Sequence, residues 1–331
     1  MLHPAIRQRL RCPTCGSPFP ADGTDALVCQ QGHPLPVRDG YLDASARPAD
    51  EATARTFASF GYEWTTFDAI QPEDEAYWRN YVADVPLDEL AGRVGLDAGC
   101  GKGRFSVFTA RHLEALVALD GSDAVQAAAR NLAGLDHVVV VRSDLRTPPF
   151  AEESFGFISC LGVLHHLPDP RAGFETLVRH LEPGGLMLLY LYSRPVERNL
   201  RALGLAAAAG LRRATVRLPH KALRALSAPI AGVLYAGLVL PGQLGDRYRV
   251  AALRGLPLQT YRAKPLRSLW LDTFDRLSAP IENRYTLDEL RAWFTGAGMA
   301  LEAARDDAGW FVVLRKPVTN AASEGLAGEP Q

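Results

Sequence analysis

The chain has 331 residues, of which 47% are hydrophobic and 22% charged, which is the composition of an ordinary globular protein. Its net charge of −1 gives no global indication of nucleic-acid binding, although a local basic face remains compatible with these numbers. Residues 1–11 contain no apolar run long enough for a signal peptide, so we expect a cytoplasmic chain with reduced cysteines.

Three of the five cysteines lie within the first 29 residues. Cys12 and Cys15 form one pair on a compact turn, and Cys29 and His33 form a second pair. Zinc prefers four such ligands in a tetrahedron, and pairs at this spacing supply them. The segment is too short for an apolar core of its own, so a metal would supply its folding energy. We therefore predict a structural zinc site, the alternative being a ribbon that has lost its metal.

Residues 1–44 as a whole resemble the zinc ribbon at the start of bacterial ribosomal-RNA guanine methyltransferases. Residues 45–92 are expected to form a helical cap or linker. An aromatic cluster begins this part, and its bulky members are Phe57, Phe60, Tyr62, Trp64 and Phe67. The sequence does not decide whether Glu63, within this cluster, is paired or exposed.

A strand, a glycine turn and the start of a helix are predicted over residues 94–111. A short apolar run ends at Asp97, and Gly99, Gly101 and Gly103 follow at alternate positions. Glycine permits a tight turn and the close approach of a ligand, and a helix that begins there directs free N–H groups at it. The third glycine of a dinucleotide motif would fall at position 104, which is Arg104, so the pattern disfavours a dinucleotide.

Acidic residues also follow the next two predicted strands. Asp120 comes 21 residues after Gly99, where a carboxylate accepts both ribose hydroxyls of a bound nucleoside. Ser122 is a candidate cap of the next helix. Strands alternate with helices at the spacing of an α/β, doubly wound, mostly parallel sheet. The expected strands are residues 94–97, 115–119, 137–142, 155–160, 186–191, 300–305 and 310–315.

The order of these strand-end signals resembles that of class I S-adenosylmethionine-dependent methyltransferases of the methyltransferase type 11 kind. The fourth-strand run Gly162-Val163-Leu164-His165-His166 adds to the resemblance. It implies a Rossmann-like fold with seven strands and S-adenosylmethionine as cofactor, bound in residues 93–192. It also implies that the aromatic cluster of residues 57–67 lies over the cofactor cleft, the alternative being aromatic core packing.

The resemblance assigns a part of the cofactor to each strand end. The glycines of the turn would lie under its methionine part, Asp97 near its ammonium group, and Asp120 at its ribose. The full set of candidate cofactor-binding residues is Asp97, Gly99, Gly101, Gly103, Asp120, Ser122, Asp144, Leu145 and Cys160, with Asp144 and Leu145 at the adenine.

Two adjacent histidines are the best candidates for a general base. His165 and His166 follow the fourth strand at the expected rim of the pocket, and histidine titrates near neutral pH. The alternative is that one of the pair packs inward and only satisfies a backbone carbonyl.

Residues 193–282 interrupt the alternating pattern as a helical insertion. Between Arg194 and Arg224 there are eight basic residues and one acid, whereas residues 226–244 carry no charge. Pro229 and Pro241 are expected to bound an apolar core too short for a bilayer span. One interpretation is a buried lid helix. The other is an interfacial patch over residues 194–244 that makes peripheral contact with the inner face of a membrane. A basic surface for RNA is a third.

The core is expected to resume over residues 283–316, where Thr286 and Glu289 form a capping box. The last strand should be antiparallel, as the family resemblance implies. The composition of residues 317–331 predicts a disordered tail.

The sequence thus favours a methyltransferase acting on a small-molecule or lipid-like acceptor, with the insertion as acceptor lid. The runner-up is a ribosomal- or transfer-RNA base methyltransferase, which the zinc ribbon favours. A non-catalytic binding protein with the same fold is a second alternative. The acceptor atom and the oligomeric state are not readable from these residues.

Overall fold

The computed structural model describes residues 2–20, 27–46, 48, 50–195, 200–307 and 309–318. The predicted disordered tail lies outside these ranges from residue 319 onward.

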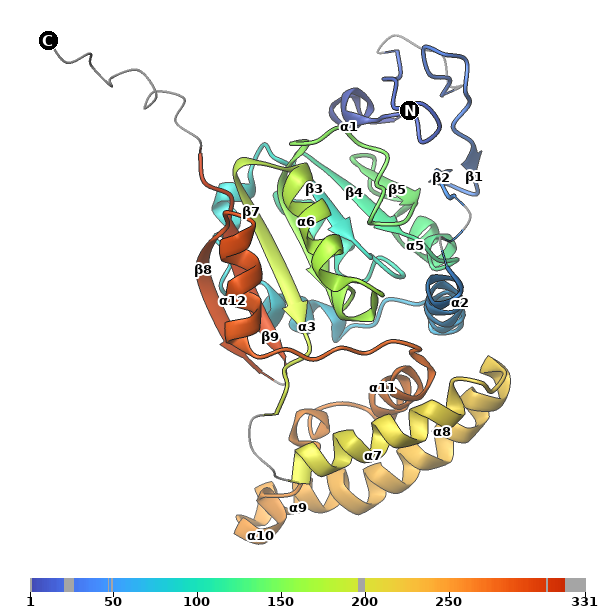
Figure 1. Ribbon diagram of the computed structural model, residues 1–331. Helices are drawn as coiled ribbons and strands as arrows, with labels where there is room; N and C mark the ends of the chain where they lie inside the picture. The colour runs from blue at the N-terminus through green and yellow to red at the C-terminus, as the bar shows by residue number, and fades with distance from the viewer. Residues whose placement is uncertain are drawn as a thin grey trace, which may run out of the picture.

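A mostly parallel sheet forms the centre of the molecule, with the strand order β1-β2-β5-β4-β3-β6-β7-β9-β8 (Figure 1). Its strands are β1 (Val37–Arg38), β2 (Tyr41–Asp43), β3 (Val94–Ala98), β4 (Ala115–Asp120), β5 (Val138–Arg142), β6 (Phe155–Leu161), β7 (Leu181–Leu191), β8 (Ala300–Asp306) and β9 (Trp310–Arg315). All seven predicted strands are present as β3 to β9. As predicted, β9 runs antiparallel to its neighbours.

The predicted strand number of seven was wrong, because the sheet has nine strands within the described residues. The two additional strands belong to the N-terminal module. β2 pairs parallel with β5, and β1 pairs antiparallel with β2. An uncovered edge of β5 would expose unpaired N–H and C=O groups, and β2 satisfies them. Strands of two and three residues carry too little periodicity to be recognised in the sequence.

The same module is attached at a second place. Its helix α1 (Pro4–Arg9) is followed by an isolated bridge between Leu10 and Phe150. The guanidinium of Arg9 donates a hydrogen bond to the Ser154 carbonyl at 2.6 Å. The module is therefore bound to the core through both its helix and its hairpin.

Helices cover both faces of the sheet, as a doubly wound fold requires. On one face, Phe174 of α6 (Pro170–His180) packs against Phe294 of α12 (Leu287–Gly296) with ring centroids 5.6 Å apart. On the other, Trp78 of α3 (Asp74–Tyr81) packs against Phe108 of α4 (Ser106–Thr109) at 5.9 Å. All five residues of β3 are buried between these layers, which explains the apolar run that precedes Asp97.

Several helix ends follow the expected local chemistry. The capping box of Thr286 and Glu289 is present at the start of α12. Asp50 caps α2 (Glu51–Thr66) by accepting a hydrogen bond from the Thr53 N–H at 2.7 Å. The helix predicted to follow the glycine turn begins only at Ser106, as α4, because residues 101–105 remain in the turn. The other short core elements are α5 (Val125–Leu132), η1 (Leu87–Leu90), η2 (Ala110–His112) and η3 (Leu164–His166).

The insertion forms a helical layer beyond the end of the sheet to which the arrowhead of β7 points (Figure 1). Its elements are α7 (Leu200–Thr215), α8 (His220–Leu234), η4 (Tyr235–Val239), α9 (Leu240–Tyr248), α10 (Ala251–Arg254), η5 (Gln259–Tyr261) and α11 (Leu266–Ser278). Helix α11 packs against α2 of the core and against α7 and α8 of the insertion. The predicted boundaries at Pro229 and Pro241 were wrong, since one continuous helix runs from His220 to Tyr248. A π-helical segment over Tyr235–Val239 lies between the two prolines and shifts the hydrogen-bond pattern.

A buried ion-pair cluster attaches the insertion to the returning chain. The carboxylate of Glu282 pairs with the guanidinium groups of Arg212, on α7, and Arg284. Burial favours a raised pKa for Glu282, but the two arginines outweigh it and lower that pKa. Glu282 thus stays ionised in the interior, and its pairing holds α7 against the segment that leads to α12.

Candidate active site

The glycine turn after β3 has the backbone conformation that the sequence predicts. Gly99, Gly101 and Gly103 all have positive φ, at +84°, +55° and +78°. A Cβ at Gly99 would lie 2.3 Å from Cγ2 of Val163, so only glycine fits there. The Leu119 carbonyl of β4 holds the turn in place by accepting hydrogen bonds from the N–H groups of Gly99 and Cys100.

Asp97 lies fully buried beneath this turn. Its carboxylate accepts hydrogen bonds from the hydroxyls of Ser106, at 2.6 Å, and Ser159, at 3.0 Å. Burial nevertheless raises the pKa of Asp97. Cys160, at the end of β6, has no exposed surface, and burial and the nearby Asp97 raise its pKa. The structure thus places both residues below the turn.

Asp120 connects the turn to the end of β4. One of its oxygens accepts a hydrogen bond from the Gly101 N–H at 2.9 Å. The other accepts from both the backbone N–H and the hydroxyl of Ser122, at 2.8 and 2.6 Å. Three of the predicted cofactor-binding residues therefore lie together at one strand end. A carboxylate has about four acceptor positions, so this arrangement leaves capacity for a ligand hydroxyl.

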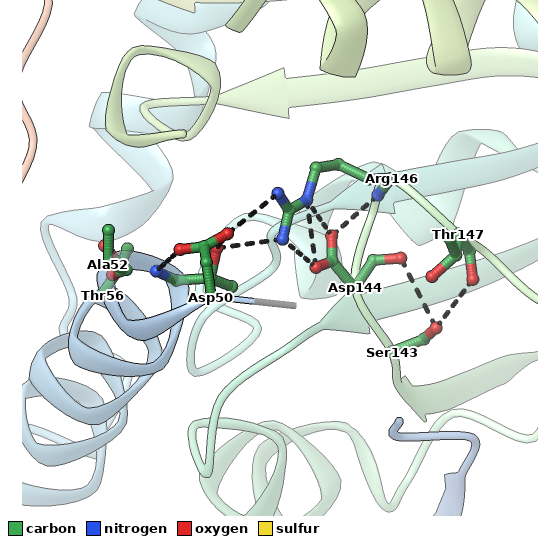
Figure 2. Close-up of polar contacts among 8 residues, drawn as sticks. Asp50, Ala52, Thr56, Ser143, Asp144, Arg146 and Thr147 are labelled. Carbon is green, nitrogen blue, oxygen red and sulfur yellow. Dashed lines mark hydrogen bonds and ion pairs between the residues drawn. The ribbon is translucent and has the colours of Figure 1, made fainter. Parts of the chain in front are cut away.

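Asp144 is held by a neighbour that the sequence analysis did not single out. Figure 2 shows the Arg146 side chain lying between Asp144 and Asp50. Its guanidinium donates to Asp144 at 2.6 Å and lies 3.8 Å from Asp50, the cap of α2. Arg146 thus joins the loop after β5 to α2. Leu145 beside it is buried in the hydrophobic core.

Helix α2 covers the glycine turn. The indole Nε1 of Trp64 would lie 3.1 Å from a Cβ at Gly101, and the ring of Phe57 would lie 2.3 Å from one at Gly121. Gly61 faces the backbone of Asp123, where a Cβ would come within 3.2 Å. The aromatic segment therefore packs directly against Gly101 of the glycine turn and against Gly121 after β4.

The two histidines have different surroundings. His165 is fully buried, and its ring stacks on that of Tyr192 at 3.9 Å; neither ring nitrogen has a partner in the described structure. Burial, followed by His166 and Arg284, lowers the pKa of His165 well below its ordinary value. His166 directs Nδ1 to the Ile281 carbonyl at 2.6 Å. A carbonyl only accepts, so Nδ1 carries the proton and Nε2 of the neutral ring is the basic nitrogen.

Two buried carboxylates complete the site, and the sequence analysis did not assign them to it. Glu63 of α2 is 2% exposed, and its Oε2 has no hydrogen-bond partner among the described residues. Asp275 of α11 accepts from the Tyr192 hydroxyl at 3.3 Å, and its Oδ1 has no such partner. Burial raises the pKa of Glu63, and Asp275 and Asp272 raise it further. The position of Glu63 within an aromatic segment was a sequence signal that its carboxylate could be buried. The sequence carried no such signal for Asp275, which lies within a long insertion.

The N-terminal ligand set is brought together as predicted. The ligand atoms of Cys12, Cys15, Cys29 and His33 all lie within 4.8 Å of one another. Nδ1 of His33 is 3.3 to 3.8 Å from the three sulfurs, and the sulfurs of Cys15 and Cys29 are 3.7 Å apart. Zinc–sulfur and zinc–nitrogen bonds of about 2.3 and 2.0 Å in a tetrahedron give edges of about 3.5 to 3.8 Å. The cluster therefore fits a zinc ion, and its sulfur separation is too long for a disulfide.

Comparison with known proteins agrees with this geometry. The methyltransferase domain family matches residues 96–189. A ubiquinone biosynthesis O-methyltransferase of Xanthomonas oryzae pv. oryzae is 34% identical over 178 residues, which are 49% of this chain and 72% of that protein. This chain belongs to the S-adenosylmethionine-dependent methyltransferases. The residues that carry the match include the glycine turn and Asp120.

Two further relatives were compared with this methyltransferase. A demethylmenaquinone methyltransferase of Clavibacter sepedonicus is 29% identical over 154 residues, 46% of this chain and 62% of that protein. The structure of an S-adenosylmethionine-dependent methyltransferase from Mesorhizobium loti covers 72% of this chain and 97% of that one, with 18% identity and a TM-score of 0.43. That TM-score is too low to add to the assignment, which rests on the sequence matches.

Replacement of Asp120 by alanine should weaken S-adenosylmethionine binding by about 10- to 100-fold, since hydrogen bonds to a charged group contribute about 1.5–3 kcal/mol. Isothermal titration calorimetry with S-adenosylhomocysteine measures the loss. Asp123→Ala is the matched control, because Asp123 lies in the same turn with its side chain 58% exposed. Equal affinities of Asp120→Ala and wild type would contradict the ribose assignment.

Replacement of Glu63 by glutamine should stabilise the protein increasingly as the pH rises. The folded pKa of Glu63 lies above the ordinary value of 4.5, so the native wild type binds its proton more tightly than the unfolded chain does. Wild type therefore loses stability as the pH rises through this window, by up to about 1.4 kcal/mol for each pH unit, and the variant does not. Urea unfolding between pH 4.5 and pH 8 tests this expectation. Glu51→Gln on the same helix, at a carboxylate 79% exposed, is the control. A stability difference between variant and wild type that does not change with pH would contradict it.

Proposed function

We propose that this methyltransferase transfers a methyl group to a hydroxyl oxygen of a lipid-like small molecule taken up at a membrane surface. The observation that carries this proposal is the outer surface of the insertion. Nine of the twelve exposed large hydrophobic side chains of the described chain lie between Leu211 and Leu266. Such a concentration in one part of a structure marks an interaction surface.

The continuous helix from His220 to Tyr248 presents most of these side chains in one row. It spans 29 residues, has a mean hydropathy of 1.7 in its most apolar window, and only 22% of that window is buried. Leu226, Val233, Leu240 and Leu244 are exposed at spacings of seven, seven and four residues, which places them on one helix face. By length and composition the helix is long enough to cross a bilayer, but Ala231 and Val239 on it are fully buried in the insertion. A helix lying in the membrane interface accounts for both observations.

Basic side chains accompany this apolar row. Exposed arginines and lysines lie before it and at its two ends: Arg213, Arg217, Lys221, Arg224, Arg247 and Arg249. Each basic residue near an anionic membrane contributes about 1 kcal/mol to binding. Arg212 does not belong to this set, since it is paired with Glu282 in the interior.

A groove of about 400 Å³ opens where the insertion meets α2. It is lined by Tyr62, Trp270, Lys221 and Arg224 together with small residues of α8. Aromatic walls with a basic rim suit the passage of an apolar ring from an interface. The relatives named above act, by their names, on demethylmenaquinone or in ubiquinone biosynthesis, which supports a lipid-soluble acceptor.

The residues of the site suit an in-line methyl transfer. When bound, S-adenosylmethionine supplies an electrophilic methyl carbon and leaves as a neutral thioether that keeps the electron pair of the broken bond. The acceptor oxygen forms the new bond to carbon while its proton passes to Nε2 of His166. The glycine turn and Asp120 hold the cofactor, and α2 and α11 exclude water from the reacting atoms.

We further propose that the N-terminal cluster binds a structural zinc ion. All four ligands come from the protein, so no position remains for a substrate. Hydrogen bonds from Ser17 lower the pKa of the Cys15 thiol to about 6, which favours the thiolate that zinc requires. The zinc module would then support the edge of the sheet through β2.

Charge reversal on the insertion should abolish membrane binding. The double variant Arg213→Glu and Arg217→Glu is expected to sediment with vesicles of 70% phosphatidylcholine and 30% phosphatidylglycerol at least about tenfold less than wild type, because each reversal replaces attraction by repulsion. Arg130→Glu with Arg291→Glu is the matched control, at arginines 58% and 55% exposed on core helices. Unchanged sedimentation of the insertion variant would contradict the proposal. Steeply salt-dependent binding to transfer RNA without vesicle binding would favour the RNA alternative.

Replacement of Cys29 by serine should remove zinc from the protein and loosen residues 1–44, because the module lacks an apolar core large enough to fold alone. Elemental analysis should find stoichiometric zinc in wild type and in the control Gln31→Ser, which changes an exposed residue of the same turn. Limited proteolysis of the Cys29→Ser variant should begin within the N-terminal module. A wild-type protein without zinc, prepared in zinc-containing medium, would contradict the assignment.

A further inference from the structure

Among the described residues, four buried polar atoms of ionisable side chains on α2, α11 and η3 have no hydrogen-bond partner. They are Oε2 of Glu63, Oδ1 of Asp275 and both ring nitrogens of His165. Such a group costs about 1–3 kcal/mol when it is left unsatisfied. Native proteins contain few of these groups, and a cluster of them in one place indicates a site that a ligand completes.

Tyr192 connects His165 with Asp275. The ring of His165 lies between that of Tyr192, at 3.9 Å, and that of His166, at 4.3 Å. The Tyr192 hydroxyl in turn donates to Asp275. Glu63 lies on α2 one helical turn after Phe60, whose ring is 4.9 Å from that of His166. Helix α2 in turn packs against α11, which carries Asp275. The cluster therefore joins the fourth-strand motif of the core to the inner face of the insertion.

The surrounding charges favour a neutral ligand group. Burial raises the pKa of both carboxyl groups, and the charge of Asp272 raises both further. The positive charges of Lys102 and Arg104 lower the pKa of Glu63, and that of Arg276 lowers the pKa of Asp275. Glu282 also acts on Asp275, but it is already paired with two arginines. The positive charges of the protein thus already offset the negative charges of the carboxylates. A ligand ammonium group would add a further positive charge that no carboxylate balances. The unpaired carboxyl oxygens require hydrogen-bond donors, and a hydroxyl supplies one without a charge.

The walls of this junction favour an aromatic ligand. Phe60 of α2 lies 4.9 Å from the ring of His166. Tyr62 of the same helix packs against Phe274 of α11 at 5.8 Å. Aromatic rings prefer offset or edge-to-face contact with other rings, and such contacts add to the binding of a flat ligand.

We propose that Glu63 and Asp275 bind ring hydroxyls of an aromatic acceptor beside Nε2 of His166, so that the insertion supplies one of the two acceptor-binding carboxylates. This inference rests on the proposed methyl transfer and identifies its acceptor as a ring that carries two hydroxyl groups. Asp275 and Glu63 position the acceptor, and His166 receives the proton of the hydroxyl that is methylated. Since α11 is part of the insertion, a core without the insertion would lack Asp275, one of the two carboxylates that bind the acceptor.

The test uses the full-length protein saturated with S-adenosylhomocysteine. The probes are octyl 3,4-dihydroxybenzoate and octyl benzoate, which differ only in the two hydroxyls, and their binding is measured by calorimetry. We expect wild type to bind the hydroxylated probe at least tenfold more tightly than octyl benzoate. Asp275→Asn and Glu63→Gln should each reduce that ratio to below threefold and leave the affinity for S-adenosylhomocysteine within twofold. Asp288→Asn, at an exposed carboxylate of α12, should keep the wild-type ratio.

Three results would overturn the inference. One is equal affinity of wild type for the two probes, and another is a tenfold ratio that persists in Asp275→Asn. The third is tighter binding of octyl 3,4-diaminobenzoate than of the dihydroxy probe, which would assign the carboxylates to an amine. Failure of wild type to bind S-adenosylhomocysteine would instead overturn the proposed methyl transfer, and this inference with it.

Stability measurements separate recognition from a structural role. Each substitution removes a buried carboxylate that lacks a full set of partners, so the unfolding temperature of the ligand-free variants should equal or exceed that of wild type. A lowered unfolding temperature together with lost probe binding would assign Glu63 and Asp275 to the fold and contradict their role in recognition.

Discussion

The close approach of α2 to the carboxyl edge of the sheet is the constraint on which the rest of the site depends. Gly61 makes it possible, because any side chain there would meet the backbone of Asp123. Once the helix lies this close, Trp64 covers the glycine turn and Glu63 is forced into the interior. Arg146 then secures the start of the helix by bridging Asp50 and Asp144. The close packing at Gly61 thus accompanies both the contact of Trp64 with the glycine turn and the burial of Glu63.

The insertion has two faces of opposite chemistry. Its inner side carries Asp275 toward the core, and its attachment is stabilised by Glu282 with two arginines. Its outer side exposes an apolar helix face with basic residues at both ends. A segment that faces the reacting groups on one side and an interface on the other has the form expected for delivering an apolar acceptor. In the proposed function, the helices that would contact the membrane belong to the same insertion that carries Asp275.

The N-terminal module adds to the fold by covering an edge. β2 satisfies the outer backbone groups of β5, the strand that leads into the loop of Asp144 and Arg146. The compact cluster of Cys12, Cys15, Cys29 and His33 organises the loops that precede β2. This arrangement gives the module a role at the cofactor side of the sheet that does not require contact with RNA.

The sequence by itself determined the seven core strands, the glycine turn, the carboxylate at Asp120 and the metal-ligand spacing, because each depends on residues close together in the chain. Buried parallel strands are recognisable by continuous apolar runs, and tight turns by glycine. Only the tertiary structure decided that Nδ1 of His166 donates to the Ile281 carbonyl, and that Arg146 pairs with Asp144. It alone also decided that nine strands form the sheet of the described residues. It also brought into contact the helices α2 and α11, which carry Glu63 and Asp275, two residues 212 positions apart in the sequence. Such contacts depend on packing between distant elements, and a charged residue carries no local signal of the partner that packing will give it.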